Sequence, residues 1–133
     1  MAVLNSPRKK FIKYLLPTYI WALAIFFVSS IPGNKIPRIF SFQDVIFHIL
    51  EYAIFGWLIN RALKNYYPDL NRRHYIYLAI TISFIYALTD EFHQAFVPYR
   101  NASILDVSLD TVGAIISGLF SPAKISKDIT YGA

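Results

Sequence analysis

Acidic and imidazole side chains recur at helical spacing within apolar parts of this sequence. Asp44, His48, Glu51 and Tyr52 follow the spacing i, i+4, i+7 and i+8, so a helix over these residues carries all four on one face. Further polar residues lie toward the C-terminal half of the chain: Asp90, Glu91, His93, Gln94, Arg100, Ser103, Asp106 and Asp110. Carboxylates are costly inside a membrane and mark functional sites there by default.

One chemistry that these acids suggest is hydrolysis, because two carboxylates that share a proton can activate water. The candidates for a catalytic role are Glu51, Glu91, Asp106 and Asp110. Asp106 and Asp110 lie only one helical turn apart, too close in sequence to resemble the separated pair of lipoprotein signal peptidase, which is also a small four-span protein.

A second chemistry is divalent-metal binding. The pairs His48-x-x-Glu51 and Asp90-x-x-His93 each place a carboxylate and an imidazole on adjacent turns. Carboxylate-bridged metal bundles use a comparable i, i+3 spacing. The metal-ligand candidates are therefore His48, Glu51, Glu91 and His93, and a divalent metal is the one cofactor that the sequence suggests.

Composition indicates that membrane helices hold these residues. The chain has 133 residues, of which 56% are hydrophobic and 16% charged, and its mean hydropathy is +0.41. A soluble domain has about 25% charged residues, and a soluble protein of this size exposes too much surface to hide so many apolar side chains. This disfavours a soluble enzyme, and the absence of cysteine excludes disulfide and thiolate-metal sites.

Four apolar segments predict an all-α integral membrane bundle, a single domain over residues 1–133 with spans at about 14–31, 44–63, 75–94 and 104–121. The last two are charge-free for fewer residues than the roughly 20 that a crossing needs. The third span must therefore extend to residues 90–94 and the fourth must begin near 103–106, which brings carboxylates into the membrane.

Basic residues predict the orientation. With four spans, ten of the thirteen cations fall on the side of the termini: Arg8, Lys9, Lys10, Lys13, Arg61, Lys64, Arg72, Arg73, Lys124 and Lys127. The positive-inside bias then places both termini in the cytoplasm and the 32–43 and 95–103 loops outside a cytoplasmic (inner) membrane. Six of the eight acids fall in the outer half. The cations are not interleaved with stacking aromatics, so nucleic acid is not an expected partner.

The polar residues also resemble those of the VanZ-like family of bacterial membrane proteins. The match is closest over 89–107 (TDEFHQAFVPYRNASILDV) and continues over 110–114 (DTVGA). Ser29-Ser30-Ile31-Pro32 at the end of the first span also fits, as do Asp44, His48, Tyr52 and Gly56 on the second. The resemblance covers roughly residues 15–120 and implies an association with reduced susceptibility to the glycopeptide antibiotic teicoplanin.

Two positions depart from the family pattern. Tyr99 stands before Arg100 where such proteins often carry glycine, and Asp110 stands where many carry asparagine. The first departure alters the turn of the loop, and the second adds a carboxylate. Gly113 and Ser117, four residues apart, predict close helix packing.

Three functions fit these observations. The first is binding or remodelling of an amphiphilic cell-envelope molecule, anionic or lipid-linked, in which Arg100 contacts a phosphate or carboxylate. Its binding residues would be Asp44, His48, Tyr52, Asp90, His93, Gln94, Arg100 and Ser103. The second is a membrane-embedded hydrolase acting on a lipid-linked substrate through carboxylates or a divalent metal. The third is a polar network that only locks the helices together.

Overall fold

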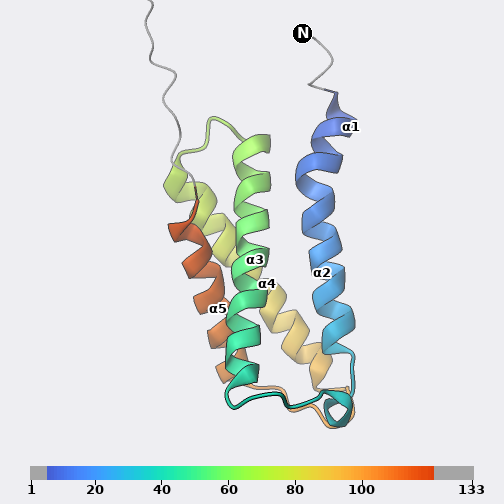
Figure 1. The fold of residues 1–133 in the computed structure, drawn as a ribbon. Coiled ribbons are helices and arrows are strands. Elements are labelled where there is room, and N and C mark those ends of the chain that lie inside the picture. Colours follow the sequence, from blue (N-terminus) through green and yellow to red (C-terminus); the bar gives the residue numbers. More distant parts are fainter. Residues whose placement is uncertain (1–5, 122–133) are drawn as a thin grey trace, which may run out of the picture.

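The protein is a helical bundle. A computed structural model describes residues 6–121, which contain α1 (Pro7–Lys10), the π-helix η2 (Phe11–Leu15), α2 (Leu16–Ser29), the 3₁₀ turn η3 (Gly33–Lys35), α3 (Gln43–Tyr66), α4 (Arg72–Gln94) and α5 (Ile104–Leu119) (Figure 1). The prediction of an all-α fold is confirmed. Lys124, Lys127 and Asp128 lie outside the described residues.

Three helices are long and apolar enough to cross a membrane: Pro7–Ser29, Gln43–Tyr66 and Arg72–Gln94. They correspond to the first three predicted spans, and each extends beyond the predicted limits at its N-terminal end. The fourth predicted span, 104–121, corresponds to α5, which has 16 residues. With 16 residues, each rising about 1.5 Å, this helix is shorter than a typical crossing, which needs roughly 20 residues.

Local sequence accounts for several helix boundaries. Ser103 begins α5 as its N-cap, and its hydroxyl oxygen accepts a hydrogen bond from Asp106 N at 3.4 Å. Asn71 caps α4 in the same way through His74 N at 3.0 Å. The wide turn of η2 directly precedes Pro17, whose ring lacks an N–H and would crowd the carbonyl four residues earlier in a regular helix.

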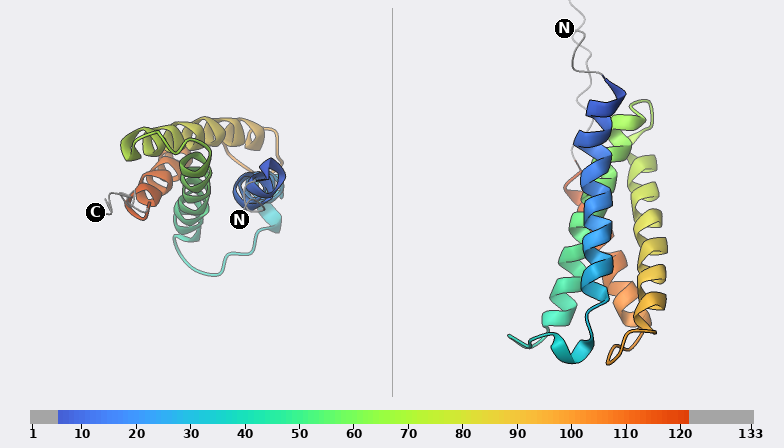
Figure 2. Two further views of the ribbon diagram at one scale, coloured as in Figure 1. Left: turned by 90° about the horizontal axis from the view of Figure 1, so that it is seen from above. Right: turned by 90° about the vertical axis from the view of Figure 1, so that its right-hand side faces the viewer.

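Helix α3 is the centre of the bundle. Viewed along the bundle, α3 lies between α5 and α2, and α4 packs across α3 and α5 (Figure 2). A Cβ atom at Gly113 of α5 would overlap the carbonyl oxygen of Ile49 on α3, and a Cβ at Gly56 would lie 2.5 Å from Ser117 Oγ. The predicted close packing at Gly113 and Ser117 is therefore present, and it is made against α3.

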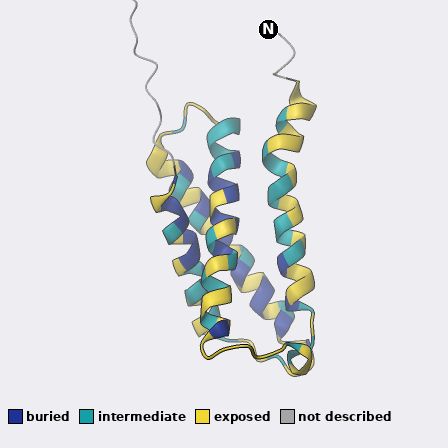
Figure 3. Ribbon diagram, in the orientation of Figure 1, coloured by how far each residue is buried: buried dark blue, intermediate teal, exposed yellow. Residues whose placement is uncertain are grey.

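Helix α2 packs more loosely than the others. Of the most apolar 18-residue window in Pro7–Ser29, the helical stretch that ends with α2, only 6% is buried, against 39% for the corresponding window in α3 and 33% in α4. The surface of α2 is mostly exposed or intermediate in Figure 3. Trp21 Nε1 donates to Glu51 O at 3.0 Å, and Tyr86 Oη donates to Ala22 O at 2.6 Å. A cavity of about 440 Å³, lined mainly by apolar side chains of η2, α2, α3 and α4, adjoins these contacts.

The segments 30–42 and 95–103 meet at one end of the bundle, which we call the loop end; Pro7 and the α3–α4 connection lie at the opposite end (Figure 1). Gly33 N donates to Pro98 O at 3.1 Å, and a Cβ at Gly33 would overlap the Tyr99 carbonyl. Tyr99 itself has a φ of 61°, in the left-handed region. This backbone is the one that glycine adopts most easily, which gives a physical reason for the glycine expected there from the family pattern.

The contact at Gly113 predicts a stability difference between two glycines of α5. Gly113→Ala should lower the free energy of unfolding by about 1–3 kcal/mol, because the added methyl group must push α5 away from the Ile49 carbonyl. Gly118→Ala is the control, since its Cβ would meet only the Ile76 side chain at 3.0 Å, and should change stability by about 0.5 kcal/mol or less. Equilibrium unfolding in detergent, followed by circular dichroism, measures both; equal losses would contradict the close packing.

The left-handed backbone at Tyr99 predicts a stabilising substitution. Tyr99→Gly should raise the free energy of unfolding by about 1 kcal/mol, because the left-handed backbone conformation destabilises a non-glycine residue by roughly this amount. The Tyr99 side chain is also mostly exposed. The same unfolding measurement tests it. Phe96→Gly is the matched control: Phe96 is also exposed but is not among the residues with positive φ, so its replacement should not stabilise.

Candidate functional site

His48 joins α3 to α5 at the loop end. Its Nδ1 lies 2.8 Å from Asp110 Oδ1, and its Nε2 lies 3.9 Å from Asp106 Oδ2. The imidazole side chain is 14% exposed, and the Asp110 side chain is fully buried. Asp106 and Asp110 face His48 together because they lie one turn apart on α5. The two acids and the imidazole therefore form one polar contact between the closely packed helices.

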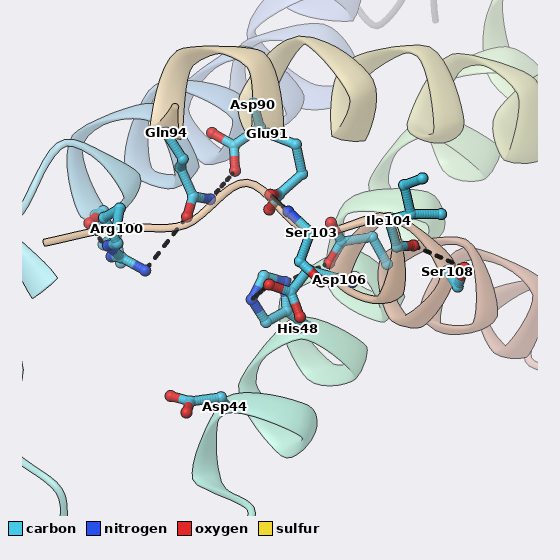
Figure 4. A network of polar contacts seen from close by, with 12 residues as sticks. Asp44, His48, Asp90, Glu91, Gln94, Arg100, Ser103, Ile104, Asp106 and Ser108 are labelled. Carbon is cyan, nitrogen blue, oxygen red and sulfur yellow. Dashed lines mark hydrogen bonds and ion pairs between the residues drawn. The ribbon is translucent and has the colours of Figure 1, made fainter. Parts of the chain in front are cut away.

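Glu91 adds a carboxylate from α4. Its Oε2 accepts a hydrogen bond from Ser103 N at 2.8 Å, which ties the end of α4 to the start of α5 (Figure 4). Its Oε1 is buried and has no hydrogen-bond partner among the described residues, and the same holds for Asp110 Oδ2 and the Tyr52 hydroxyl. Buried polar atoms without partners are rare in folded proteins and call for an explanation.

Three of these side chains are close enough to hold one metal ion. His48, Glu91 and Asp110 each offer a ligand atom, and the three atoms lie within 4.8 Å of one another. His48 and Glu91 were predicted as ligands from the sequence. The other two predicted ligands, Glu51 and His93, are not members of this group, and Asp110 joins it instead.

His93 points toward α2. Its Nε2 lies 3.0 Å from Ser30 Oγ, and its ring is 4.6 Å from that of Phe26 between centroids. Glu51 lines a cavity beside the site together with Asp90. Neither predicted i, i+3 pair lies complete within the group of three that the described residues form.

A second polar network runs from α4 to Arg100. Gln94 Nε2 donates to Asp90 Oδ2 at 2.9 Å, and Arg100 Nη1 donates to Gln94 Oε1 at 3.4 Å (Figure 4). Asp90 and Gln94 are both buried. The remaining Arg100 contacts are to the end of α2, where Nε and Nη2 donate to the carbonyls of Ile31 and Val28, each at 3.1 Å. Arg100 thus has a fixed orientation and adds hydrogen bonds to two carbonyl groups at the end of α2, of which that of Val28 also accepts from Ile31 N.

Two adjoining cavities lie between these networks, with volumes of about 240 and 220 Å³. Both are lined by Asp44, His48, Gln94 and Arg100. The larger also contacts Asp106 and Tyr99, whereas the smaller also contacts Glu51 and Asp90. Acidic, basic and amide side chains from α3, α4, the 95–103 segment and α5 therefore face one connected region.

Three further predicted site residues make contacts of other kinds. The Asp44 carboxylate is 63% exposed and lies 3.6 Å from the Arg38 guanidinium, an exposed pair of a kind that contributes little to stability. Tyr52 is buried against Phe55. Ser103 contributes its backbone N–H to Glu91 and its hydroxyl to the cap of α5.

Gln43 is a residue of this end that the sequence analysis missed. It is buried, its Nε2 donates to Pro37 O at 2.9 Å and its Oε1 accepts from Ile39 N at 2.7 Å. It thereby holds the 30–42 segment against the start of α3, and it lines the larger of the two cavities. Its one sequence signal is an uncharged polar residue directly before the first acid of the polar face.

Comparison with known proteins identifies the family to which the chain belongs. The family described as VanZ/LLP1 matches residues 11–124, which include every helix of the bundle from η2 to α5. No curated protein and no solved structure matches the chain. The family match covers the residues of both polar networks, and its extent confirms the resemblance inferred from the motifs. The chain belongs to the VanZ-like family, and its helices fit a multi-pass membrane protein.

Proposed function

We propose that this protein crosses the cytoplasmic membrane four times, with both termini in the cytoplasm and the loop end at the outer face. Of the eleven described cations, the thirteen of the chain less Lys124 and Lys127, eight lie toward the end with Pro7 and the α3–α4 connection. The other three, Lys35, Arg38 and Arg100, lie at the loop end. The positive-inside bias supports the orientation. A fourth crossing by α5 is supported by its packing along α3 and α4.

At that face the protein binds, or remodels, an amphiphilic molecule of the cell envelope. The observation that carries this proposal is the pair of adjoining cavities, the larger mainly polar and the smaller mainly apolar, that share Asp44, His48, Gln94 and Arg100. Their combined lining suits a polar head group, and the exposed apolar surface of the neighbouring helices suits its lipid tail. Sequestering or altering such a molecule is also how the protein would affect susceptibility to a glycopeptide antibiotic.

Arg100 is the proposed contact for an anionic part of the head group. A guanidinium has five N–H groups, and three contacts within the described residues hold that of Arg100 in place. The remaining N–H groups are available to a phosphate or carboxylate, which match the planar geometry of arginine. Because the side chain is already oriented, binding loses little side-chain entropy.

The acids of the same region favour a head group that also carries a cation. Glu51 and Asp90 line the smaller cavity, and Asp106 lines the larger. Carboxylates close together in a low dielectric need compensation by a proton, a histidine, a metal or a ligand cation. A head group with an amine as well as an anionic group meets both requirements.

Hydrolysis of a lipid-linked substrate is the second candidate function, and the His48–Asp110 contact favours it. A carboxylate 2.8 Å from Nδ1 orients the ring, and Nε2 then faces Asp106 beside the larger cavity. An imidazole held in this way can accept a proton from water as a general base. Turnover of lipid-linked substrates by the purified protein distinguishes hydrolysis from binding alone.

Binding is tested first at Arg100. Arg100→Ala should weaken binding of fluorescent phosphatidylglycerol to the purified protein by roughly 10- to 100-fold, since a charge-assisted hydrogen bond contributes about 1.5–3 kcal/mol. Fluorescent diacylglycerol, which has the same lipid tail but no phosphate, measures the contribution of the tail alone and should be affected less. Equal retention of phosphatidylglycerol by the variant and the unaltered protein would exclude Arg100 as the anion contact.

Two control variants and one stability measurement accompany the Arg100→Ala variant. Arg73→Ala removes the same charge at the opposite end of the bundle, where Arg73 is exposed, and should leave lipid binding unchanged. Arg100→Ala also removes donors from the Ile31 and Val28 carbonyls, so unfolding must be measured in parallel. Arg100→Lys keeps the charge but loses the planar donor geometry, and it should bind with intermediate affinity.

Substitution of the acids distinguishes a ligand site from a network that only stabilises the fold. Glu51→Gln and Asp106→Asn keep the shape of each side chain and should change the free energy of unfolding by about 1 kcal/mol or less, because an interhelical hydrogen bond in a membrane contributes about 0.6 kcal/mol. Both should nevertheless alter lipid binding, since both residues line the cavities. Unfolded variants, or folded variants with unchanged binding, would favour the structural network.

A further inference from the structure

The geometry points to a divalent transition-metal site formed by His48, Glu91 and Asp110, from three different helices. The inference concerns the deepest part of the loop end and does not depend on the lipid binding proposed above. It also differs from the ligand set predicted from the sequence, which contained Glu51 and His93 in place of Asp110.

The positions of the donors support the site. One ligand atom from each residue lies within 4.8 Å of the others, and His48 Nδ1 and Asp110 Oδ1 are 2.8 Å apart. Two neighbouring ligands, each about 2.1 Å from an ion, lie roughly 3 Å apart. The α3–α5 contact therefore already holds two donors at a separation suited to a shared metal, and α4 supplies the third.

Oxygen atoms without partners give independent support. Asp110 is fully buried and Glu91 is 5% exposed, and each has one carboxylate oxygen without a hydrogen-bond partner among the described residues. Leaving a buried charged oxygen unpaired is expensive. The other oxygen of Glu91 accepts from Ser103 N, and the other oxygen of Asp110 lies beside His48 Nδ1, so both side chains are held in place. An ion bound between Nδ1 and Asp110 Oδ1 would replace the hydrogen bond between these two atoms.

Charge favours a cation at this position. Two buried carboxylates contribute to the donor set, and Asp106 lies 3.9 Å from His48 Nε2 as a third. A divalent ion balances the two ligand carboxylates, and Asp106 is placed to support the His48 ring from outside the ligand set.

The donor types indicate the class of metal. An imidazole nitrogen with two carboxylates suits Mn²⁺, Fe²⁺ or Zn²⁺, whereas Mg²⁺ and Ca²⁺ favour all-oxygen sites. Protein ligands at three positions also leave coordination positions open for water or for a phosphate oxygen of a bound molecule.

Metal binding is measured on the full chain in detergent after removal of metals with a chelator. Supplying Mn²⁺ or Zn²⁺ should restore one ion per chain by elemental analysis, and excess Mg²⁺ should not displace it. With Mn²⁺, pulsed electron paramagnetic resonance should detect a coupled imidazole nitrogen, and His48→Gln should abolish that coupling. A protein that takes up no ion, an ion that Mg²⁺ displaces, or a bound Mn²⁺ without nitrogen coupling would overturn the assignment.

Variants identify the ligands. Asp110→Asn and Glu91→Gln, which nearly preserve side-chain shape, should each weaken binding at least ~100-fold, and Asp106→Asn should weaken it by roughly 10- to 100-fold as a supporting residue. The matched controls are Asp44→Asn, an exposed acid of α3, and His93→Gln, whose ring contacts Ser30; both should bind as the unaltered protein does. Equal loss in the controls, or full binding by folded Asp110→Asn protein, would contradict the site.

Discussion

The close approach of α5 to α3 determines the arrangement of the polar groups at the loop end. Gly113 lies directly against the backbone of Ile49 and Ala53, and Gly56 lies against the small Ser117 side chain and the Ala114 backbone, so no large side chain separates the two helices at these levels. One to two turns nearer the loop end, the same proximity brings Asp110 to 2.8 Å from His48. A wider helix spacing would leave the Asp110 carboxylate without this partner, and the Asp106 contact would be lost with it.

Backbone groups at helix ends form hydrogen bonds with charged side chains inside the apolar bundle. The N–H at the start of α5 binds Glu91, and the carbonyls at the end of α2 bind Arg100. Helix ends leave such groups unpaired, and their partial charges favour an acid near an N-terminus and a cation near a C-terminus. Glu91 and Arg100 thus complete two helix ends, and Arg100 also lines both cavities.

Much of this arrangement follows from sequence periodicity. The polar face of α3, the turn that separates Asp106 from Asp110 and the small residues Gly113 and Ser117 were all predicted from spacing, and the family pattern was recognised from the same residues. Periodicity gives the face of each helix, but it does not give the rotation and axial offset of one helix against another. The sequence therefore did not pair His48 with Asp110, nor did it direct His93 toward Ser30. The short α5 and the buried Gln43 depend on tertiary contacts in the same way.

The loose packing of α2 makes the bilayer itself part of this protein's structure. Only 6% of the most apolar 18-residue window of Pro7–Ser29 is buried within the protein, so in a bilayer the main neighbours of this helix are lipid chains. Hydrogen bonds hold it to the rest of the protein at Trp21, Ala22 and Val28. A helix surrounded by lipid adjusts its tilt to the thickness of the hydrocarbon layer, whereas α3 and α5 are held by each other's backbones. A change in membrane thickness would therefore act on the apolar cavity beside α2, and the polar groups between α3 and α5 would keep their spacing.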